Sequence, residues 1–294
     1  MTPLRQHMIA ALQLSGKGER TQDAYVRAVR LLTHFYGTSP ALISAPELQD
    51  SFLHRTNVDG LAPAAMRICY SGIRFFYQPV LQRDWHTLSL MRAQTAPRLP
   101  AVLSVQEVRR LLKAATPLHH QVYFTTVYSL GLRLHEALSL QVSDSDAQRL
   151  IVHVHRGQGA KDRYVPLPED PLALLRTYWK THRNQTWLLP ATGRDQNQSP
   201  TATEPMRRHS VQGAFRQATQ RAASTKTGLA IPSLRHAYAT PLLAAGVNLR
   251  LIQQSLGHPR LETTMVYVPL THKGHEDAYQ RINSLRRGLA SCLP

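Results

Sequence analysis

Cysteine is scarce in this sequence, which contains only Cys69 and Cys292 among its 294 residues. Two cysteines so far apart do not predict a disulfide framework, and this favours a reducing compartment. The N-terminal residues also lack the continuous apolar segment and cleavage site of a secretory signal, and 18 apolar residues nowhere follow one another. These absences predict a cytoplasmic protein with no membrane partner.

Acidic residues are also few. The chain has 18 Asp and Glu against 35 Lys and Arg, a formal net charge of +17 and a pI near 10.5. A polyanion is the natural partner for such a surface, and its binding should weaken as the salt concentration rises. On composition alone, a well-solvated basic surface without a specific partner remains the alternative. The sequence shows no Walker-type phosphate loop and no internal repeat.

Hydrophobic periodicity divides the chain into two predicted domains. Residues 3–36 have helical spacing with one Ser-Gly-Lys-Gly break, and further helices are expected from Ala45 and from near Pro63. This predicts a small all-helical domain over residues 1–95, whose aromatic side chains belong to the core rather than to base stacking. A linker is expected at about 93–103, where two prolines interrupt any periodicity.

The second predicted domain covers residues 100–294 and mixes helices with a small β-hairpin. Ser104 and Glu107 form a capping box before an amphipathic helix, and a long apolar helix ends at Gly131. Two β-rich runs joined by a glycine-containing turn then predict a hairpin. The expected elements are the long helix at 122–130, the hairpin at 150–168, further helices at 171–179 and 211–222, and a tail helix with an apolar stripe at 278–289.

The first strand of this hairpin places His153 and His155 on one face. Two imidazoles are potential metal ligands, but a zinc site needs a third and usually a fourth ligand at suitable spacing. The spacing identifies no such ligand. Contacts across the strands or to a phosphate are therefore the favoured interpretation, and no metal is predicted.

A further combination of residues suits phosphoryl transfer. Arg235 opens a helical stretch, His258 lies in a Leu-Gly-His turn, and Tyr267 follows a Thr-Thr pair. An arginine can hold two oxygens of one phosphate, an imidazole can add a hydrogen bond to the charge that develops there, and a phenol can attack and become esterified. No metal is needed for this chemistry. Each residue taken singly has an ordinary structural explanation, and only the set favours the catalytic one.

The order and spacing of these residues resemble the C-terminal signature of the tyrosine recombinases, the phage-integrase and Xer-like strand-exchange enzymes. The resemblance covers residues 100–275 firmly and 5–95 loosely. Around Arg133 and Glu136 the sequence also resembles the first arginine box of that family. The matching groups are Gly131-Leu132-Arg133, Glu136-Ala137-Leu138, Leu234-Arg235-His236, Ala239-Thr240, Ala245-Gly246-Val247, Leu256-Gly257-His258 and Thr263-Thr264-x-x-Tyr267.

The resemblance implies a mainly α protein in which a helical, SAM-like core-binding domain precedes a mixed α/β catalytic domain. It implies a site-specific recombinase or integrase in which Tyr267 attacks a DNA phosphate to form a 3′-phosphotyrosyl intermediate. Arg133, Arg235 and His258 would stabilise the transition state, and Glu136 would hold Arg133. Because the energy of the broken ester stays in the protein link, no nucleotide cofactor or metal is implied.

The implied partner is double-stranded DNA, at paired sites where the tail helix of one protomer docks on the next to form a tetramer. Packing of that helix within its own chain is an equally open alternative. Accessory DNA-bending proteins and association with the nucleoid belong to the same expectation. The expected DNA contacts are Lys17, Arg20, Arg163, Arg207 and Arg208.

Two positions depart from the family pattern. Gln158 stands where the lysine of the family protonates the departing 5′ oxygen, and glutamine cannot deliver a proton near neutral pH. Lys161 is a candidate substitute, although a side chain three residues on should point differently. Pro232 replaces a histidine that shuttles the tyrosine proton. Two alternatives therefore stay open, a catalytically impaired DNA-binding protein derived from a recombinase and a type IB topoisomerase-like enzyme.

Gln158 leads to a kinetic prediction. Leaving-group protonation should limit cleavage of an ordinary phosphodiester in single-turnover assays, since general acid catalysis contributes about 10²–10⁴-fold. A bridging 5′-phosphorothiolate, whose thiolate leaves without a proton, should be cleaved much faster. Gln158→Lys should accelerate only the ordinary substrate, and Lys161→Ala should slow it only if Lys161 has taken over the role. Equal, fast cleavage of both substrates by the unmodified protein would show that another acid is in place.

Overall fold

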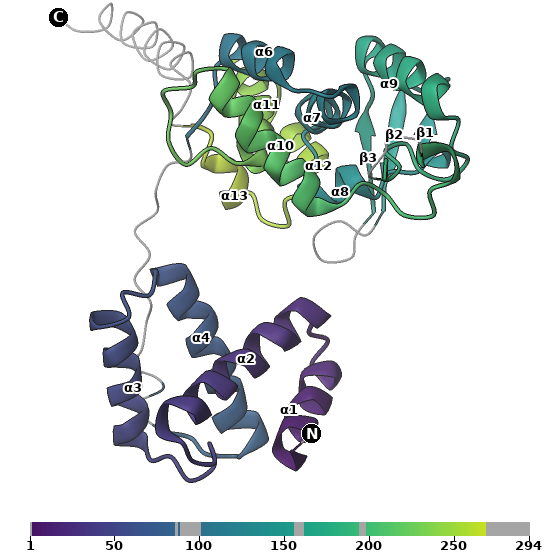
Figure 1. Ribbon diagram of the computed structural model, residues 1–294. Helices are drawn as coiled ribbons and strands as arrows, with labels where there is room; N and C mark the ends of the chain where they lie inside the picture. Colours follow the sequence, from purple (N-terminus) through teal and green to yellow (C-terminus); the bar gives the residue numbers. More distant parts are fainter. Residues whose placement is uncertain (1, 86–87, 89–100, 156–161, 194–197, 269–294) are drawn as a thin grey trace, which may run out of the picture. The chain divides into compact units, whose positions relative to one another are not determined.

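The computed structural model describes residues 2–85, 88, 101–155, 162–193 and 198–268 (Figure 1). Within these residues the chain is mainly helical with one three-stranded sheet, which confirms the predicted fold class. The chain divides into two compact units, an N-terminal unit at Met1–Arg98 and a C-terminal unit at Leu99–Pro294. No helix of the described part is long and apolar enough to cross a membrane.

The N-terminal unit is a group of helices around an apolar core. Phe52, Phe76 and Tyr77 are fully buried in that core, as predicted for the aromatic residues, whereas Phe35 remains 44% exposed. The third helix begins directly after Ser44, whose backbone N–H donates to the Glu47 carboxylate at 2.7 Å. The elements are α1 (Pro3–Leu14), α2 (Glu19–Tyr36), α3 (Ala45–Asn57), α4 (Pro63–Phe75) and the π-helix η1 (Phe76–Val80).

The C-terminal unit is built around α7 (Leu118–Leu130), a helix that is apolar on most sides and therefore buried. It packs against α9 (Glu169–His182) and α11 (Ile231–Ala244). In Figure 1, α11 lies on one side of α7, and α9 lies on the other side, next to the sheet. α7 ends at Gly131, where φ is +60° and a Cβ would lie 2.6 Å from the Tyr238 ring. The other helices are α6 (Val105–Ala114), α8 (Leu134–Leu138), α10 (Arg208–Arg221), α12 (Leu249–Leu256) and α13 (Glu262–Met265), with 3-10 turns η2 (Val142–Asp144) and η3 (Ser199–Thr201).

The sheet consists of β1 (Ser145–Asp146), β2 (Ile151–Val154) and β3 (Arg163–Pro166), all antiparallel and in sequence order. Val152 pairs with Val165, and both side chains are buried against the helices. Because side chains alternate along a strand, His153 and its partner Tyr164 lie on the opposite face. The strands of the predicted hairpin are thus present.

Several expectations fall on other parts of the chain. Residues 156–161, which contain Gln158 and Lys161, lie outside the described residues, as do most of the expected linker and the expected tail helix at 278–289. A proline inside a helix, such as Pro241, is expected to kink or locally unwind it. The helix α11 continues through Pro241 to Ala244, so it is not unwound there.

Candidate active site

Arg235 lies on α11 and is almost completely buried, with 5% of the residue exposed. Its guanidinium donates hydrogen bonds to the carbonyls of Gly131 (2.7 Å) and Leu256. Gly131 directly follows α7, and Leu256 is the last residue of α12. Burial lowers the pKa of Arg235 to about 9, and the charge of Arg133 acts in the same direction while Glu136 opposes it. The side chain is still charged at neutral pH.

Arg133 precedes α8 and reaches the same place from another part of the fold. Its Nη1 donates to the Leu256 carbonyl at 3.3 Å and its Nη2 to the Gly257 carbonyl at 3.2 Å. The two arginines therefore share one backbone oxygen, although they are far apart in the chain. Gly257 has φ of +62°, and a Cβ there would lie 2.9 Å from the Arg163 side chain, so glycine is required for this close approach.

Glu136 is the common counter-ion of the arginines. Its carboxylate accepts hydrogen bonds from Arg133 Nη1 at 2.7 Å and from Arg163 Nη1 and Nη2 at 2.9 and 2.7 Å, and Arg235 Nη1 lies 3.7 Å away. Burial by itself raises the pKa of this carboxyl, but the hydrogen bonds and charges of Arg163 and Arg133 lower it to about 2. Glu136 is therefore ionised throughout the physiological range.

Arg163 was expected to contact DNA, and the structure places its guanidinium inside the domain. The side chain is 9% exposed, and besides its two bonds to Glu136 it donates from Nε to the Ser255 carbonyl at 2.9 Å. This bidentate pairing connects β3 to α8 and α12. A contact of Arg163 with DNA remains a prediction.

His258 follows Gly257 at the end of α12. Its Nδ1 lies 2.9 Å from the hydroxyl of Thr264, which is fully buried and belongs to the Thr-Thr pair noted in the sequence. Burial and the charges of Arg235 and Arg133 lower the pKa of His258 to about 4. The ring is therefore neutral at pH 7, and its hydrogen bond to Thr264 fixes its orientation beside the arginines.

Tyr267 is buried, with 2% of the residue exposed, in a small cluster with Ala239, Ile252 and Leu256. Its ring is nearly parallel to that of His258, with centroids 6.4 Å apart. Burial raises the pKa of the phenol above 10, while the charges of Arg235 and Arg133 lower it in part. The hydroxyl therefore keeps its proton at neutral pH and needs an acceptor before it can attack.

His236 supplies such an acceptor, a role that the sequence analysis did not assign. Its Nδ1 lies 2.9 Å from the Tyr267 hydroxyl. Burial and the charge of Arg235 lower the pKa of His236 below 6.5, so the neutral ring has a lone pair at pH 7. A sequence signal existed: His236 is one helical turn after Pro232, and residues four apart share a helix face.

The sequence of residues 101–273 matches the pattern of the phage integrase family, and residues 4–87 match that of the phage integrase N-terminal SAM-like domain. The chain belongs to the phage integrase family.

Relatives within this family are named as recombinases. The chain is 36% identical over 269 residues to the putative integrase/recombinase y4qK of Sinorhizobium fredii, across 91% of this chain and 84% of that protein. It is 32% identical over 241 residues to the tyrosine recombinase XerD of Caulobacter vibrioides, across 75% of each. A lambda integrase tetramer bound to a Holliday junction has the same fold, with a TM-score of 0.71 at 15% identity across 89% of this chain and 76% of that one. The protein is a tyrosine site-specific recombinase, and the two alternatives are not favoured.

The other expected site residues belong to both units. Lys17 and Arg20 are exposed between α1 and the first turn of α2. At the start of α10, Arg207 is exposed and Arg208 is partly buried. Pro232 occupies the first turn of α11, where a missing N–H costs no helical hydrogen bond. Contacts of these basic residues with DNA remain predictions.

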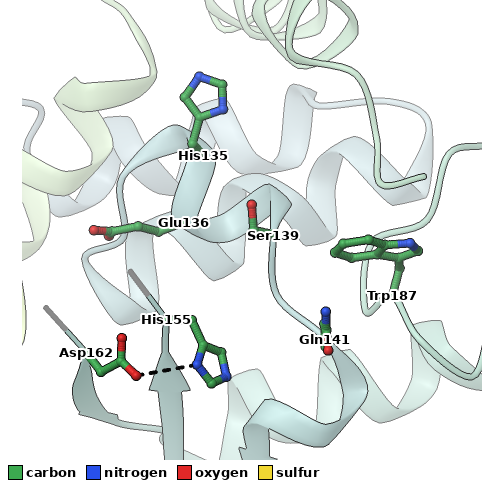
Figure 2. Close-up of a pocket in the computed structure, with 7 residues that line it drawn as sticks. All are labelled: His135, Glu136, Ser139, Gln141, His155, Asp162 and Trp187. Carbon is green, nitrogen blue, oxygen red and sulfur yellow. Dashed lines mark ion pairs between the residues drawn. The ribbon is translucent and has the colours of Figure 1, made fainter. Parts of the chain in front are cut away.

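A cavity of about 640 Å³ adjoins the arginine cluster through Glu136 (Figure 2). It contains none of the catalytic candidates Arg133, Arg235, His258 and Tyr267 among its lining residues. Figure 2 shows His155 and the Asp162 carboxylate facing each other on one side of it. The lining residues are His135, Glu136, Ser139, Gln141, His155, Asp162 and Trp187.

The burial of Glu136 leads to a stability prediction. Glu136→Gln should lower the free energy of unfolding by about 3–5 kcal/mol, because it leaves buried arginines without their counter-ion. Linkage gives a similar scale: a carboxyl with a pKa of about 2 when folded and 4.5 when unfolded contributes roughly 3 kcal/mol above pH 4.5, and this is lost as the pH falls towards 2. Urea denaturation at pH 7 measures the difference.

The matched control is Glu169→Gln, at an exposed position in the first turn of α9. It should change the free energy of unfolding by no more than about 0.5 kcal/mol. If Glu136→Gln costs less than about 1 kcal/mol, the arginine cluster does not depend on this carboxylate.

Proposed function

We propose that this recombinase cleaves duplex DNA by attack of the Tyr267 oxygen on a scissile phosphate. The new bond joins the phenol oxygen to phosphorus and the bond to the 5′ oxygen breaks, which leaves a 3′-phosphotyrosyl link and a 5′-hydroxyl. Attack by the 5′-hydroxyl of a partner strand reverses the step and exchanges the strands. The observation that carries this proposal is the Tyr267 hydroxyl held 2.9 Å from His236, beside the arginine cluster.

The arginine cluster supplies positive charge where the phosphate must bind. Three guanidinium groups, of Arg133, Arg163 and Arg235, surround the single carboxylate of Glu136, so positive charges outnumber negative ones among these four side chains. Because the site is largely buried, these charges act on a phosphate more strongly than they would in water. We assign Arg133 and Arg235 to the phosphate oxygens, with Glu136 and Arg163 holding them in place.

We assign His258 and His236 to different atoms of the reaction. The neutral His258 ring donates its remaining N–H to a phosphate oxygen, since Thr264 occupies the other nitrogen. His236 accepts the proton of Tyr267 as the phenol oxygen attacks, in place of the family histidine that Pro232 replaces. For the departing 5′ oxygen, Lys161 remains the candidate acid and Gln158 the altered position.

DNA recognition involves both units in this proposal. Lys17 and Arg20 of the N-terminal unit and Arg207 and Arg208 of the C-terminal unit contact phosphates, in line with the net charge of +17. The lambda integrase structure is a tetramer on a Holliday junction, and we propose a tetramer on paired DNA sites here, with the tail helix at 278–289 docked on the neighbouring protomer. Accessory DNA-bending proteins and a place at the nucleoid in the cytoplasm belong to the same proposal.

The identity of the nucleophile is tested with a nicked suicide duplex that traps the covalent adduct. Tyr267→Phe should abolish the protein–DNA adduct on denaturing gels and leave the affinity for DNA nearly unchanged, because it removes one hydroxyl and keeps the ring packed. Tyr279→Phe is the matched control and should form the adduct normally. Persistence of the adduct in Tyr267→Phe would contradict the assignment.

The role of His236 predicts a pH dependence of single-turnover cleavage. The rate should fall in the acid range as His236 takes up a proton, at a pH lower than for an ordinary imidazole because its pKa is lowered, and fall again above about pH 9, where Arg235 loses its charge. His236→Ala should cleave about 10²–10⁴-fold more slowly and lose the acid limb. Added imidazole should restore part of its rate, which a purely structural role would not allow. An unchanged acid limb in His236→Ala would place the base elsewhere.

A further inference from the structure

The β2–β3 hairpin brings three potential metal ligands to its outer face. His153 lies in β2, His155 directly follows the end of β2, and Asp162 directly precedes β3. One ligand atom from each of the three lies within 4.8 Å of the others. The sequence analysis had found no third ligand because Asp162 is seven positions beyond His155, and only the antiparallel pairing places it opposite.

We propose that His153, His155 and Asp162 form a binding site for a divalent transition-metal ion of the zinc class. The proposal concerns a site separate from the Tyr267 chemistry, and it does not rest on the proposed function. Imidazole nitrogens with one carboxylate suit Zn²⁺, Ni²⁺ or Cu²⁺, whereas Mg²⁺ and Ca²⁺ prefer oxygen ligands alone.

The separations between ligand atoms fit such an ion. Zinc–nitrogen and zinc–oxygen bonds of about 2.0–2.1 Å put neighbouring ligands of a tetrahedron about 3.3–3.4 Å apart. Asp162 Oδ2 lies 3.3 Å from His153 Nε2 and 3.6 Å from His155 Nδ1. Only small side-chain rotations are needed to close the triangle around one ion.

Asp144 orients one of these ligands. Its buried carboxylate lies 2.7 Å from His155 Nε2 and also accepts the Gln141 backbone N–H at 2.8 Å. With a hydrogen on Nε2 donated to Asp144, the lone pair of His155 Nδ1 faces the Asp162 carboxylate. This is the carboxylate–histidine–metal arrangement of protein zinc sites, in which the outer carboxylate fixes the tautomer. A cation between Nδ1 and Asp162 is attracted by both lone pairs.

The surroundings leave room for a further ligand. His155 and Asp162 line the cavity of about 640 Å³, and Figure 2 shows both of them at its edge. His153 stacks on the Tyr164 ring, with centroids 4.7 Å apart, which limits the rotation of its imidazole. A water molecule from the cavity completes the coordination.

A metal ion at this site would connect the two strands of the hairpin. His155 and Asp162 are the residues that flank 156–161 in the sequence, and Arg163 directly follows Asp162. A metal bound by both strands would join them at the ends of this connection, beside the Arg163–Glu136 pair. Binding should therefore stabilise the hairpin without taking part in the transesterification.

The experiment titrates the full-length, metal-free protein with Zn²⁺ in competition with a chromogenic chelator. One ion should bind with micromolar or tighter affinity, and His155→Ala or Asp162→Asn should weaken it at least tenfold. Asp144→Asn should weaken it about 10–100-fold, as expected for a carboxylate that orients a ligand. The matched control is His209→Ala, which removes an exposed histidine from α10 and should bind Zn²⁺ like the parent chain.

Thermal unfolding provides the second measurement, because an ion that binds only the folded state raises Tm. Zn²⁺ should raise the Tm of the parent protein and of His209→Ala, but not that of the double variant with His153→Ala and His155→Ala. Equal Zn²⁺ affinity in the parent and that double variant would overturn the proposal, as would equal affinity for Mg²⁺. The adduct assay on a suicide duplex should proceed without Zn²⁺, so failure of one proposal is distinguishable from failure of the other.

Discussion

A single buried carboxylate organises the catalytic unit. Glu136 binds Arg133 and Arg163 directly and lies 3.7 Å from Arg235, so side chains from α8, β3 and α11 depend on one charge. Burying an unpaired arginine would cost several kcal/mol, and the carboxylate offsets that cost while leaving the cluster positive. The same arrangement that holds the fold together at this point supplies the positive charge that the proposed reaction requires at the phosphate.

Helix ends complete the positioning of the arginines. The carbonyls of Leu256 and Gly257 and of Gly131 lie at the C-terminal ends of α12 and α7, where helices leave carbonyl groups without an intrahelical partner. These ends also carry partial negative charge, which favours a nearby cation. The arginine side chains satisfy the carbonyls, and the glycines allow the chain to turn there. The ends of α7 and α12 therefore also fix the positions of the two arginine side chains.

In the proposed reaction, proton transfer involves other residues than the family pattern implies. Pro232 removes one titratable group from α11, and His236, one turn later, holds the Tyr267 hydroxyl. The proposal assigns protonation of the leaving 5′ oxygen to the segment that contains Gln158 and Lys161, and His155 and Asp162 flank that segment in the sequence. A metal ion bound there would constrain the ends of that segment without taking part in the transesterification.

The sequence by itself determined the helical N-terminal domain, the hairpin strands and the set Arg133, Arg235, His258 and Tyr267, because caps, periodicity and motif spacing are local properties. Only the tertiary structure decided that Arg163 pairs with Glu136, that His236 holds Tyr267, and that Asp162 completes a cluster with two histidines. Each of these depends on which residues from distant segments lie together in the fold. Spacing within one segment does not specify that, and it gave a signal only for His236, one helical turn after Pro232. The continuous α11 shows the same limit, since a proline inside a helix predicts a kink or local unwinding, whereas α11 runs through Pro241 as one helix that packs against α7.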